Sequence, residues 1–367
     1  MKVLWLTNIP SPYRVEFFNE LGKYCELTVL FEKKASDERD ESWKTFNTDN
    51  FQLIYLRGKN IGVAEAFCPG VIKYLNCTYD HIVITNFSDL TGILAIAVLR
   101  AKKIPYIIES DGGFAGSGRG VKEEIKRWLL SGAKLYFSTA IEHDKYYLTY
   151  GAKPEEIIRY PFTSLRREDI RTKPVNYVEK MKLREKLGMK EEKIILSVGQ
   201  FIHRKGYDIL FEALSKIDSS IGCYILGGKP TDEYIQMIKK LNLTNVHFID
   251  FKLKNELNEY YRAADVFVHP TREDIWGLVI NEAMAQGLPV ITTERCVAGL
   301  ELIQEPILGK IVQTENSEAL SNAIHGELEN LSEERSYKIL EKIKEYTIEH
   351  MARVHIECLE RIEKSDK

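Results

Sequence analysis

The chain has 367 residues, of which 44% are hydrophobic and 29% are charged, and its formal net charge at pH 7 is −3. This composition is that of a globular protein and excludes a disordered or collagen-like chain. A net charge so close to zero provides no general attraction to nucleic acid. The length exceeds what one hydrophobic core usually organises, so we expect two domains.

The cysteines and histidines give no sign of a bound metal or a disulfide framework. The six cysteines include no CxxC pair, and several lie inside apolar runs, where a buried small side chain is the simplest interpretation. The segment from Met1 to Thr7 is too short for a signal peptide, and the longest apolar run, 90–99, is too short to span a bilayer. We therefore expect a cytoplasmic protein without a structural zinc.

Short β-branched runs alternate along the chain with amphipathic segments of helical length. In the first half we predict strands at 1–7, 26–32, 51–57, 81–86, 105–110, 134–139 and 157–161. Helices are predicted between several of them, at 14–24, 90–102, 122–131 and 140–150. Apolar strands connected through helices are typical of parallel sheets that are covered on both faces.

The second half repeats the same alternation. Its predicted strands lie at 193–198, 221–227, 245–251, 264–269, 288–293 and 308–313, and its helices at 206–217, 231–242, 254–263, 277–286 and 316–330. The fold class we predict is therefore α/β, with two Rossmann-like domains whose parallel sheets face a central cleft.

Charge and composition suggest where the domains meet. Residues 171–200 contain 8 basic and 4 acidic side chains, whereas 201–367 contain 20 and 28. We predict a first domain over 1–170, a charged linker over 171–192, a second domain over 193–346, and a C-terminal helix over 347–367 that packs back on the first domain.

The segment after the predicted strand 264–269 has the pattern of an anion site. Asp274 stands where a helix N-cap belongs, and Gly287 ends the helix. Gly277 and Leu278 then present free backbone N–H groups at a helix N-terminus, which suits a phosphate. The equally supported alternative at this point is purely structural, with Asp274 as an N-cap and Glu282 as a solvated helix residue.

Two carboxylates flank that helix start at a distance that suits an extended ligand. Asp274 and Glu282 are eight positions apart, about 12 Å along a helix. A hydrolase pair is closer, at about 5–9.5 Å, so shared attack on one glycosidic bond is disfavoured. A nucleotide-sugar, with hydroxyls at both ends and a pyrophosphate between them, has the required shape.

The same segment resembles a known signature. Asp274-x7-Glu282 with the following Ala-Met-Ala-x-Gly-x-Pro-Val is similar to the Glu-x7-Glu motif of family 4 retaining glycosyltransferases, which have the GT-B fold. The resemblance implies that Glu282 holds the nucleotide ribose and that Asp274 contacts the donor sugar. Aspartate replaces the usual glutamate at the first position, and the neighbouring Glu273 is the alternative sugar contact.

Further strand ends in the second half match the same family. The turn from Gly199 to Asp208 is similar to the family's Gly-Arg-x4-Lys-Gly-x-Asp clamp on the donor pyrophosphate, with Lys205 as the matching lysine. Gln200 occupies the arginine position, and we expect Arg204 to supply the missing cation. The remaining donor-binding candidates at strand ends are Gly228, Phe251 and Lys252.

The first half offers candidates for the acceptor side. Ligands of open parallel sheets bind at the carboxyl ends of strands, which places Glu109 and Asp111 near the chemistry. Asp111 is the candidate catalytic residue there, and Arg14, after the first strand, is a candidate anion contact. The glycine-rich stretch 114–120 lacks the lysine of a P-loop, and we interpret it as a mobile loop over the cleft.

The resemblance implies a retaining hexosyltransferase that uses a UDP- or GDP-sugar, needs no metal or cofactor, and acts in surface polysaccharide or glycolipid biosynthesis. Its partners would be the nucleotide-sugar and a saccharide or lipid-linked saccharide acceptor, without nucleic acid. The amphipathic stretch 122–130, with Trp128, would permit peripheral contact with the inner face of the membrane, although such a helix more often packs on its own sheet. Two alternatives stay open, a sugar-nucleotide 2-epimerase and a non-catalytic nucleotide-sugar-binding subunit.

Overall fold

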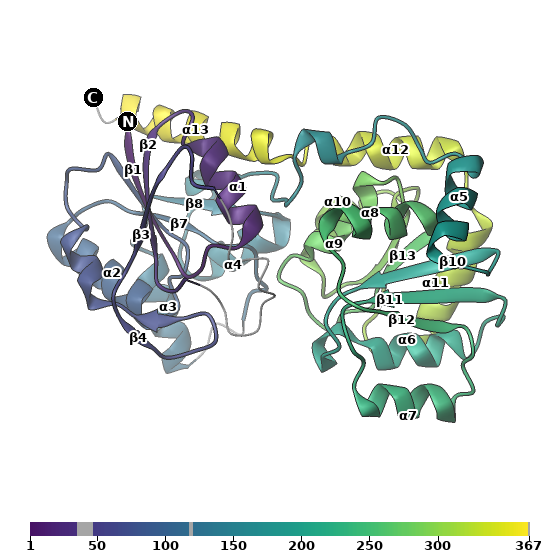
Figure 1. Cartoon of the computed structure of the whole chain (residues 1–367). Coiled ribbons are helices and arrows are strands. Elements are labelled where there is room, and N and C mark those ends of the chain that lie inside the picture. The colour runs from purple at the N-terminus through teal and green to yellow at the C-terminus, as the bar shows by residue number, and fades with distance from the viewer. Residues whose placement is uncertain (35–46, 117–119, 366–367) are drawn as a thin grey trace. The chain divides into compact units, whose positions relative to one another are not determined.

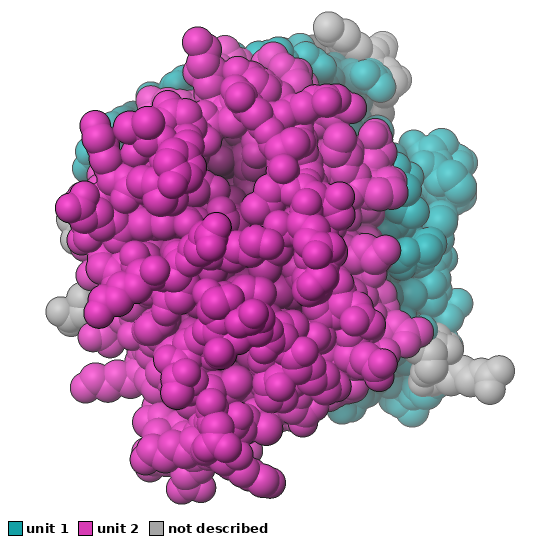
Figure 2. Space-filling view, turned by 90° about the vertical axis from the view of Figure 1, so that its right-hand side faces the viewer, with its two compact units in different colours: residues 1–164, 346–367 teal, residues 165–345 magenta. Residues whose placement is uncertain are grey.

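The computed structural model describes residues 1–34, 47–116 and 120–365. They divide into two compact units, which Figure 2 colours separately: unit 1 comprises 1–164 and 346–367, and unit 2 comprises 165–345. Each unit is built on one parallel sheet with helices, which confirms the predicted α/β fold class. Neither unit contains, within the described residues, a helix that is both long and apolar enough to cross a membrane.

Unit 1 contains a seven-stranded parallel sheet in the order β3-β2-β1-β6-β7-β8-β9. The strands are β1 (Lys2–Thr7), β2 (Glu26–Phe31), β3 (Gln52–Tyr55), β6 (His81–Ile84), β7 (Ile107–Glu109), β8 (Leu135–Ser138) and β9 (Ile157–Arg159). The helices are α1 (Pro12–Leu21), α2 (Leu90–Lys102), α3 (Val121–Leu130), α4 (Ile141–Thr149) and α13 (Ile348–Ser365). All predicted strands and helices of this half are therefore present, within a few residues of the expected bounds.

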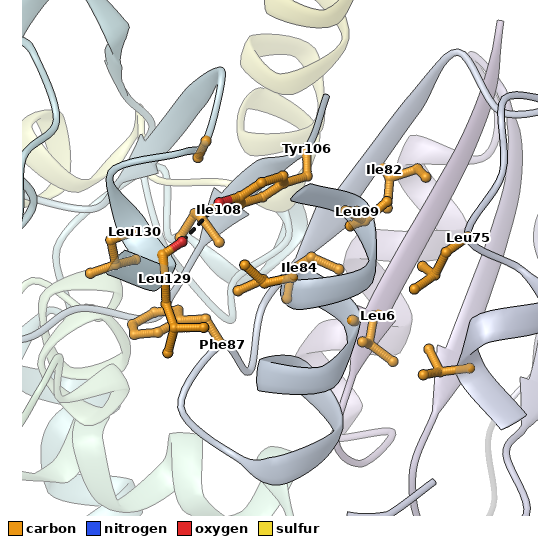
Figure 3. Packing of buried hydrophobic residues seen from close by; sticks show 14 of the residues in the cluster. Leu6, Leu75, Ile82, Ile84, Phe87, Leu99, Tyr106, Ile108, Leu129 and Leu130 are labelled. Atoms are coloured by element: carbon orange, nitrogen blue, oxygen red, sulfur yellow. Dashed lines mark hydrogen bonds between the residues drawn. The ribbon is translucent and has the colours of Figure 1, made fainter. Parts of the chain in front are cut away.

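The central strand β1 shows how the sheet fills both of its faces. Successive side chains of a strand point to opposite faces, and every residue from Val3 to Leu6 is buried. Leu4 and Leu6 join the core under α2 and α3 (Figure 3), where the Tyr106 hydroxyl donates a 2.8 Å hydrogen bond to the Leu129 carbonyl. Trp5 points the other way and packs against Phe17 of α1.

The C-terminal helix α13 is part of unit 1. It runs beside α1 (Figure 1) and places the fully buried His355 against aromatic side chains of that face. The ring centroid of His355 lies 5.0 Å from that of Phe17 and 4.1 Å from that of Phe137. The face of the sheet opposite α2 is thus covered by a helix from each end of the chain.

A small antiparallel pair extends unit 1 beyond the predicted elements. β4 (Lys59–Asn60) pairs with β5 (Ala66–Phe67), and the short helix η2 (Pro69–Lys73) follows. The two strands are too short to produce a periodic sequence pattern, which is why the sequence did not reveal them.

Unit 2 contains a six-stranded parallel sheet in the order β12-β11-β10-β13-β14-β15. The strands are β10 (Lys193–Val198), β11 (Ile221–Leu226), β12 (Val246–Ile249), β13 (Val266–His269), β14 (Val290–Thr293) and β15 (Gly309–Val312). The helices are α5 (Tyr177–Leu187), α6 (Tyr207–Leu214), α7 (Asp232–Lys240), α8 (Lys254–Ala263), α9 (Leu278–Ala285), α10 (Val297–Leu302), α11 (Ser317–Glu329) and α12 (Glu333–Ile343). The predicted elements of the second half are all present.

The segment 171–192, predicted as a charged linker, is assigned to unit 2. It contains α5, which packs against α8. The Arg184 guanidinium of α5 is buried, with a 2.6 Å contact to a carboxylate oxygen of Asp265. The charges of this segment therefore form internal contacts of unit 2.

The strand order fixes where a ligand can enter unit 2. The chain runs outward from β10 through β11 to β12 on one side, and from β13 through β14 to β15 on the other. β10 and β13 are thus the neighbouring strands at which the order reverses. In open α/β sheets, ligands bind at the carboxyl ends of such strands. The loops after β10 and β13 begin at Gly199 and Pro270.

Candidate active site

The loop after β10 is held against the loop after β13 by a glycine. The chain forms a short helix, η5 (His203–Lys205), and then turns at Gly206, whose φ is +69°. A Cβ atom at this position would lie 2.0 Å from the Pro270 carbonyl oxygen. Only glycine allows this close approach, which brings the basic residues of η5 to the carboxyl end of β13.

Lys205 and Asp274 form the centre of the site. The Lys205 Nζ atom lies 2.6 Å from Asp274 Oδ2, and both side chains are largely buried. His269, the last residue of β13, places its Nε2 atom 3.1 Å from the same oxygen. The carboxylate of Asp274 is therefore fixed by a lysine 69 positions away and by the histidine that ends the preceding strand.

These contacts keep the aspartate ionised. Burial by itself would raise the pKa of Asp274, but the hydrogen bond from His269 and the charge of Lys205 outweigh it and hold the pKa well below its usual range. Burial also lowers the pKa of His269. A neutral imidazole that donates its Nε2 proton to Asp274 agrees with both shifts.

The other acid in the loop points elsewhere. Glu273 is exposed and forms an ion pair with Arg295, which follows β14. The Arg204 guanidinium donates a 2.7 Å hydrogen bond to the Glu273 carbonyl and lies 3.5 Å from Asp274 Oδ1. Arg204 is thus beside Lys205, where we expected the missing cation of the clamp, and its side chain is 47% exposed.

The helix after Asp274 begins later than predicted, and Asp274 does not cap it. The residue before α9 is Gly277, with a φ of +106° and no side-chain cap. A Cβ atom on Gly277 would lie 2.9 Å from Cys296 Sγ. Asp274 instead forms a bridge to Cys296, and its N–H donates to the Arg295 carbonyl at 2.8 Å.

The later helix start also changes the expected separation of Asp274 and Glu282. Because α9 starts at Leu278, the four residues from Asp274 to Gly277 lie outside the helix, and a helical rise of 12 Å does not describe the separation of Asp274 and Glu282. The first amides of α9 still have no partner within the helix, as at any helix start. They follow the glycine turn directly beside Asp274.

Glu282 lies in the second turn of α9 and contacts α8. The Tyr261 hydroxyl donates a 3.0 Å hydrogen bond to Glu282 Oε2. Tyr261 is fully buried, and burial raises its pKa well above the usual value, so this hydroxyl keeps its proton and serves as a donor. One oxygen of Glu282 is thereby held, and the carboxylate is partly exposed.

The remaining donor-side candidates lie at the ends of β11 and β12. Gly228 has a φ of +97° and open space where a side chain would be. Phe251 is 51% exposed, and Lys252 lies 3.4 Å from Glu256. An exposed aromatic ring at a strand end can stack on a base, whereas nothing in the structure fixes Lys252 toward a ligand.

In unit 1, the acceptor-side candidates form a buried charged cluster. Arg14 of α1 is 3% exposed and ion-paired with both Glu109, the last residue of β7, and Asp111, two positions further on. The Tyr13 hydroxyl donates a 2.6 Å hydrogen bond to the second oxygen of Asp111, and the Tyr160 hydroxyl donates at 3.0 Å to Glu109. Arg14, predicted as an anion contact, is neutralised by carboxylates of its own unit.

Ser110, between these two acids, contacts a second buried histidine. Its Oγ atom lies 2.8 Å from His143 Nε2. The Thr139 N–H donates to His143 Nδ1 at 3.2 Å, which fixes the tautomer so that Nε2–H donates to the serine. Burial lowers the pKa of His143 to about 3, so it is a neutral packing residue. Of the glycine-rich stretch 114–120, residues 117–119 lie outside the described part of the chain.

Three residues of the site were not among the predictions. His269 and Arg295 both lie at or just after the carboxyl end of a strand, which is a signal that sequence reading could have used. Tyr261 lies inside α8, where its helical position suggests only core packing. Its contact with Glu282 depends on how α8 and α9 pack, and no local pattern reports it.

Comparison with known proteins defines the class. Residues 179–350 match the family model "Glycosyl transferases group 1". Over this segment, which is just under half of its length, the chain is similar to the group 1 glycosyltransferases. In its fold it resembles HepE of Anabaena, solved in complex with UDP and glucose, with a TM-score of 0.74 and 17% identity over 99% of this chain and 100% of that one. The protein therefore has the GT-B fold.

Two curated relatives illustrate the family. The lipopolysaccharide glucosyltransferase WaaG of Escherichia coli K12 is 35% identical over 31% of each chain. A teichuronic acid biosynthesis glycosyltransferase designated putative, TuaC of Bacillus subtilis, is 24% identical over 88% of each chain. The matches to this chain cover between 31% and 40% of the length of each of the first five curated relatives.

Proposed function

We propose that this protein is a retaining glycosyltransferase that moves a hexosyl group from a UDP- or GDP-sugar to the hydroxyl of a saccharide or lipid-linked saccharide. The observation that carries the proposal is the Lys205–Asp274 ion pair of 2.6 Å, at the two strand ends where the sheet order reverses. The match of residues 179–350 to the glycosyltransferase family model supports the reaction class. Relatives named for lipopolysaccharide and teichuronic acid synthesis support a role in surface polysaccharide or glycolipid biosynthesis.

In the proposed mechanism, stabilisation of the departing diphosphate is the main catalytic device. Negative charge grows on the diphosphate as the glycosidic bond breaks, and fixed donors beside it lower the barrier. Lys205, Arg204 and the backbone amides of Gly277 and Leu278 are the donors we assign to this role. They lie on both sides of Asp274, so a diphosphate there would replace the carboxylate as the partner of Lys205.

We assign a role to each carboxylate from the contacts that hold it. Tyr261 holds one oxygen of Glu282, and we assign this carboxylate to the ribose hydroxyls of the nucleotide. Asp274 is the sugar contact we favour over Glu273, because Glu273 is exposed and paired with Arg295. Metal is not required in this account, since the cations and the helix start neutralise the charge.

We also propose that α3 makes peripheral contact with the inner face of the membrane. Val121, Ile125 and Trp128 are 79%, 49% and 46% exposed, and their spacing places them on one side of the helix. Such an exposed apolar stripe suits the interface of a bilayer. If the stripe binds lipid, vesicle flotation will weaken with Ile125→Ser and Trp128→Ser, and unchanged flotation would refute the contact.

The reaction is tested by NMR analysis of the products formed from UDP- and GDP-hexoses, with and without a pool of saccharide acceptors. We expect acceptor-dependent release of nucleoside diphosphate, a product with the anomeric configuration of the donor, and no loss of rate with EDTA. An epimerised sugar nucleotide from donor alone would instead identify an epimerase. Nucleotide binding without transfer or slow donor hydrolysis would identify a binding subunit.

A further inference from the structure

A pocket of about 420 Å³ opens in unit 1, at the carboxyl ends of β2 and β3. Its lining includes Glu32, Lys33, Lys34, Leu56, Arg57 and Asn60. The volume is within the range of sites for small molecules, and the carboxyl edge of a parallel sheet is where such ligands bind. None of these residues belongs to the site described above.

The pocket contains three cationic side chains and a single acid. Glu32 is 4% exposed, and its Oε2 atom accepts a 3.1 Å hydrogen bond from the Ala66 N–H. The Asn86 side-chain nitrogen donates both to Glu32 and to the carboxylate of Asp89, so two buried acids share one neighbourhood. Burial and the charge of Asp89 raise the pKa of Glu32 to about 9, and the acid is therefore neutral at pH 7.

The cations consequently face the pocket without a compensating negative charge from Glu32. Lys33 is 8% exposed, and its Nζ atom donates to the carbonyl oxygens of Val63 at 2.9 Å and Gly62 at 3.3 Å. Lys34 and Arg57 are exposed, and neither forms an ion pair with any described residue. A basic pocket of this size selects an anion, and an arginine beside a lysine suits phosphate.

We propose that this pocket binds the phosphate group of a sugar-phosphate ester carried by the acceptor, with Lys34 and Arg57 as its ligands. The proposal rests on the proposed function, because it assigns the anion to the acceptor of the transfer reaction. The contacts with two backbone carbonyls hold the Lys33 side chain in place as part of the pocket lining. The exposed side chains of Lys34 and Arg57 are the ones that we assign to the ligand. The phosphate can belong to a soluble sugar phosphate or to the headgroup of a glycolipid.

The test is a calorimetric titration of the full chain with α-D-glucose 1-phosphate and, separately, with D-glucose, both in saturating UDP so that the donor site is filled. We expect one equivalent of glucose 1-phosphate to bind, no measurable binding of glucose, and weaker binding at higher salt. The double variant Lys34→Gln, Arg57→Gln should lose at least tenfold in affinity. Lys73→Gln, an exposed lysine of η2 outside the pocket, is the matched control and should bind as the unaltered protein does.

Flotation with phosphatidylglycerol vesicles distinguishes the source of the phosphate. Vesicle binding that the double variant loses and Lys73→Gln retains would support the same pocket with a lipid headgroup as the ligand. Equal binding of glucose 1-phosphate by the double variant, equal affinity for glucose, or binding of neither probe would overturn the proposal. If neither UDP nor GDP stabilises the protein while glucose 1-phosphate still binds through Lys34 and Arg57, the pocket stands and the proposed function fails.

Discussion

Lys205 Nζ contacts Asp274 Oδ2 at 2.6 Å, although the two residues are 69 positions apart in the chain. They meet because β10 and β13 are neighbours in the sheet and each residue follows one of these strands. The ion pair holds the Lys205 ammonium group at the position where we expect the diphosphate of the donor to bind. It also keeps a buried aspartate charged before the ligand arrives.

The first prediction concerns this lysine. Lys205→Ala should weaken the binding of a nucleoside diphosphate by about 100-fold, because it removes a buried charge-assisted contact of about 2–4 kcal/mol. Arg204→Ala should cost less, about tenfold, since its guanidinium is half exposed. Calorimetry measures both, with Lys216→Ala, an exposed lysine that contacts Ser317, as the control. Full affinity in Arg204→Ala would show that Arg204 does not replace the arginine absent at Gln200.

A second prediction separates the carboxylate of Glu282 from the tyrosine that holds it. Glu282→Gln should reduce affinity for the nucleotide by about 10–100-fold, because charge-assisted hydrogen bonds to the ribose are lost. Tyr261→Phe removes the 3.0 Å hydrogen bond behind the carboxylate, together with a 3.5 Å contact to the Val279 carbonyl, and should cost about 0.5–1.5 kcal/mol. Binding of the nucleotide and of the matching 2′-deoxy nucleotide should be compared, and equal discrimination by all three proteins would remove the ribose role.

The third prediction concerns the turn before α9. Gly277→Ala should destabilise the fold by about 1–3 kcal/mol, because φ is +106° and the new Cβ would lie 2.9 Å from Cys296 Sγ. Gly326→Ala, inside α11 with open space around its Cβ position, should instead be neutral or stabilise by up to about 1 kcal/mol. Urea denaturation followed by circular dichroism compares the two, and equal effects would refute the strain argument.

A fourth prediction is a pH dependence of stability. The pKa of His143 is lowered to about 3 in the folded protein, so between about pH 6.5 and 3 the unfolded chain binds a proton that the folded one does not. Stability from this residue is therefore present above pH 6.5 and is lost as the pH falls toward 3, by about 2 kcal/mol at pH 5. His355, whose pKa is also lowered to about 3, acts in the same direction.

The contribution of one histidine can be isolated by substitution. Denaturant unfolding at several pH values should show a flatter decline below pH 6.5 for His143→Gln than for the unaltered protein. His325→Gln, at an exposed position of α11, should leave the decline unchanged. A decline as steep in His143→Gln as in the unaltered protein would mean that His143 is not the group that titrates.

Much of the fold could be predicted because it depends on local patterns. Apolar runs such as Ile194–Leu196 leave no polar face, which requires a sheet that is buried on both sides. The repeated alternation with amphipathic segments then requires parallel strands. The two-residue strands β4 and β5 were missed because a pair so short has no periodicity to detect.

The site was harder to predict because its contacts are distant in sequence. Asp274 has the residue type of an N-cap, yet its side chain is committed to Lys205 and His269. From its place at the start of a helix, Arg14 would be expected to be solvated. In the structure it pairs with Glu109 and Asp111, which are 95 and 97 positions away. Residue type and spacing pointed to these loops, and the packing of the strands decides which groups in them pair.

The central claim is that unit 2 binds a nucleotide-sugar at Lys205 and Glu282. A thermal-shift screen with UDP, GDP, ADP and their sugars tests it most directly, because a ligand at 100 times its Kd adds about 2.7 kcal/mol of stability. The account predicts a clear rise in Tm with one uridine or guanosine nucleotide, which Lys205→Ala and Glu282→Gln diminish. An unchanged Tm with every nucleotide would contradict it.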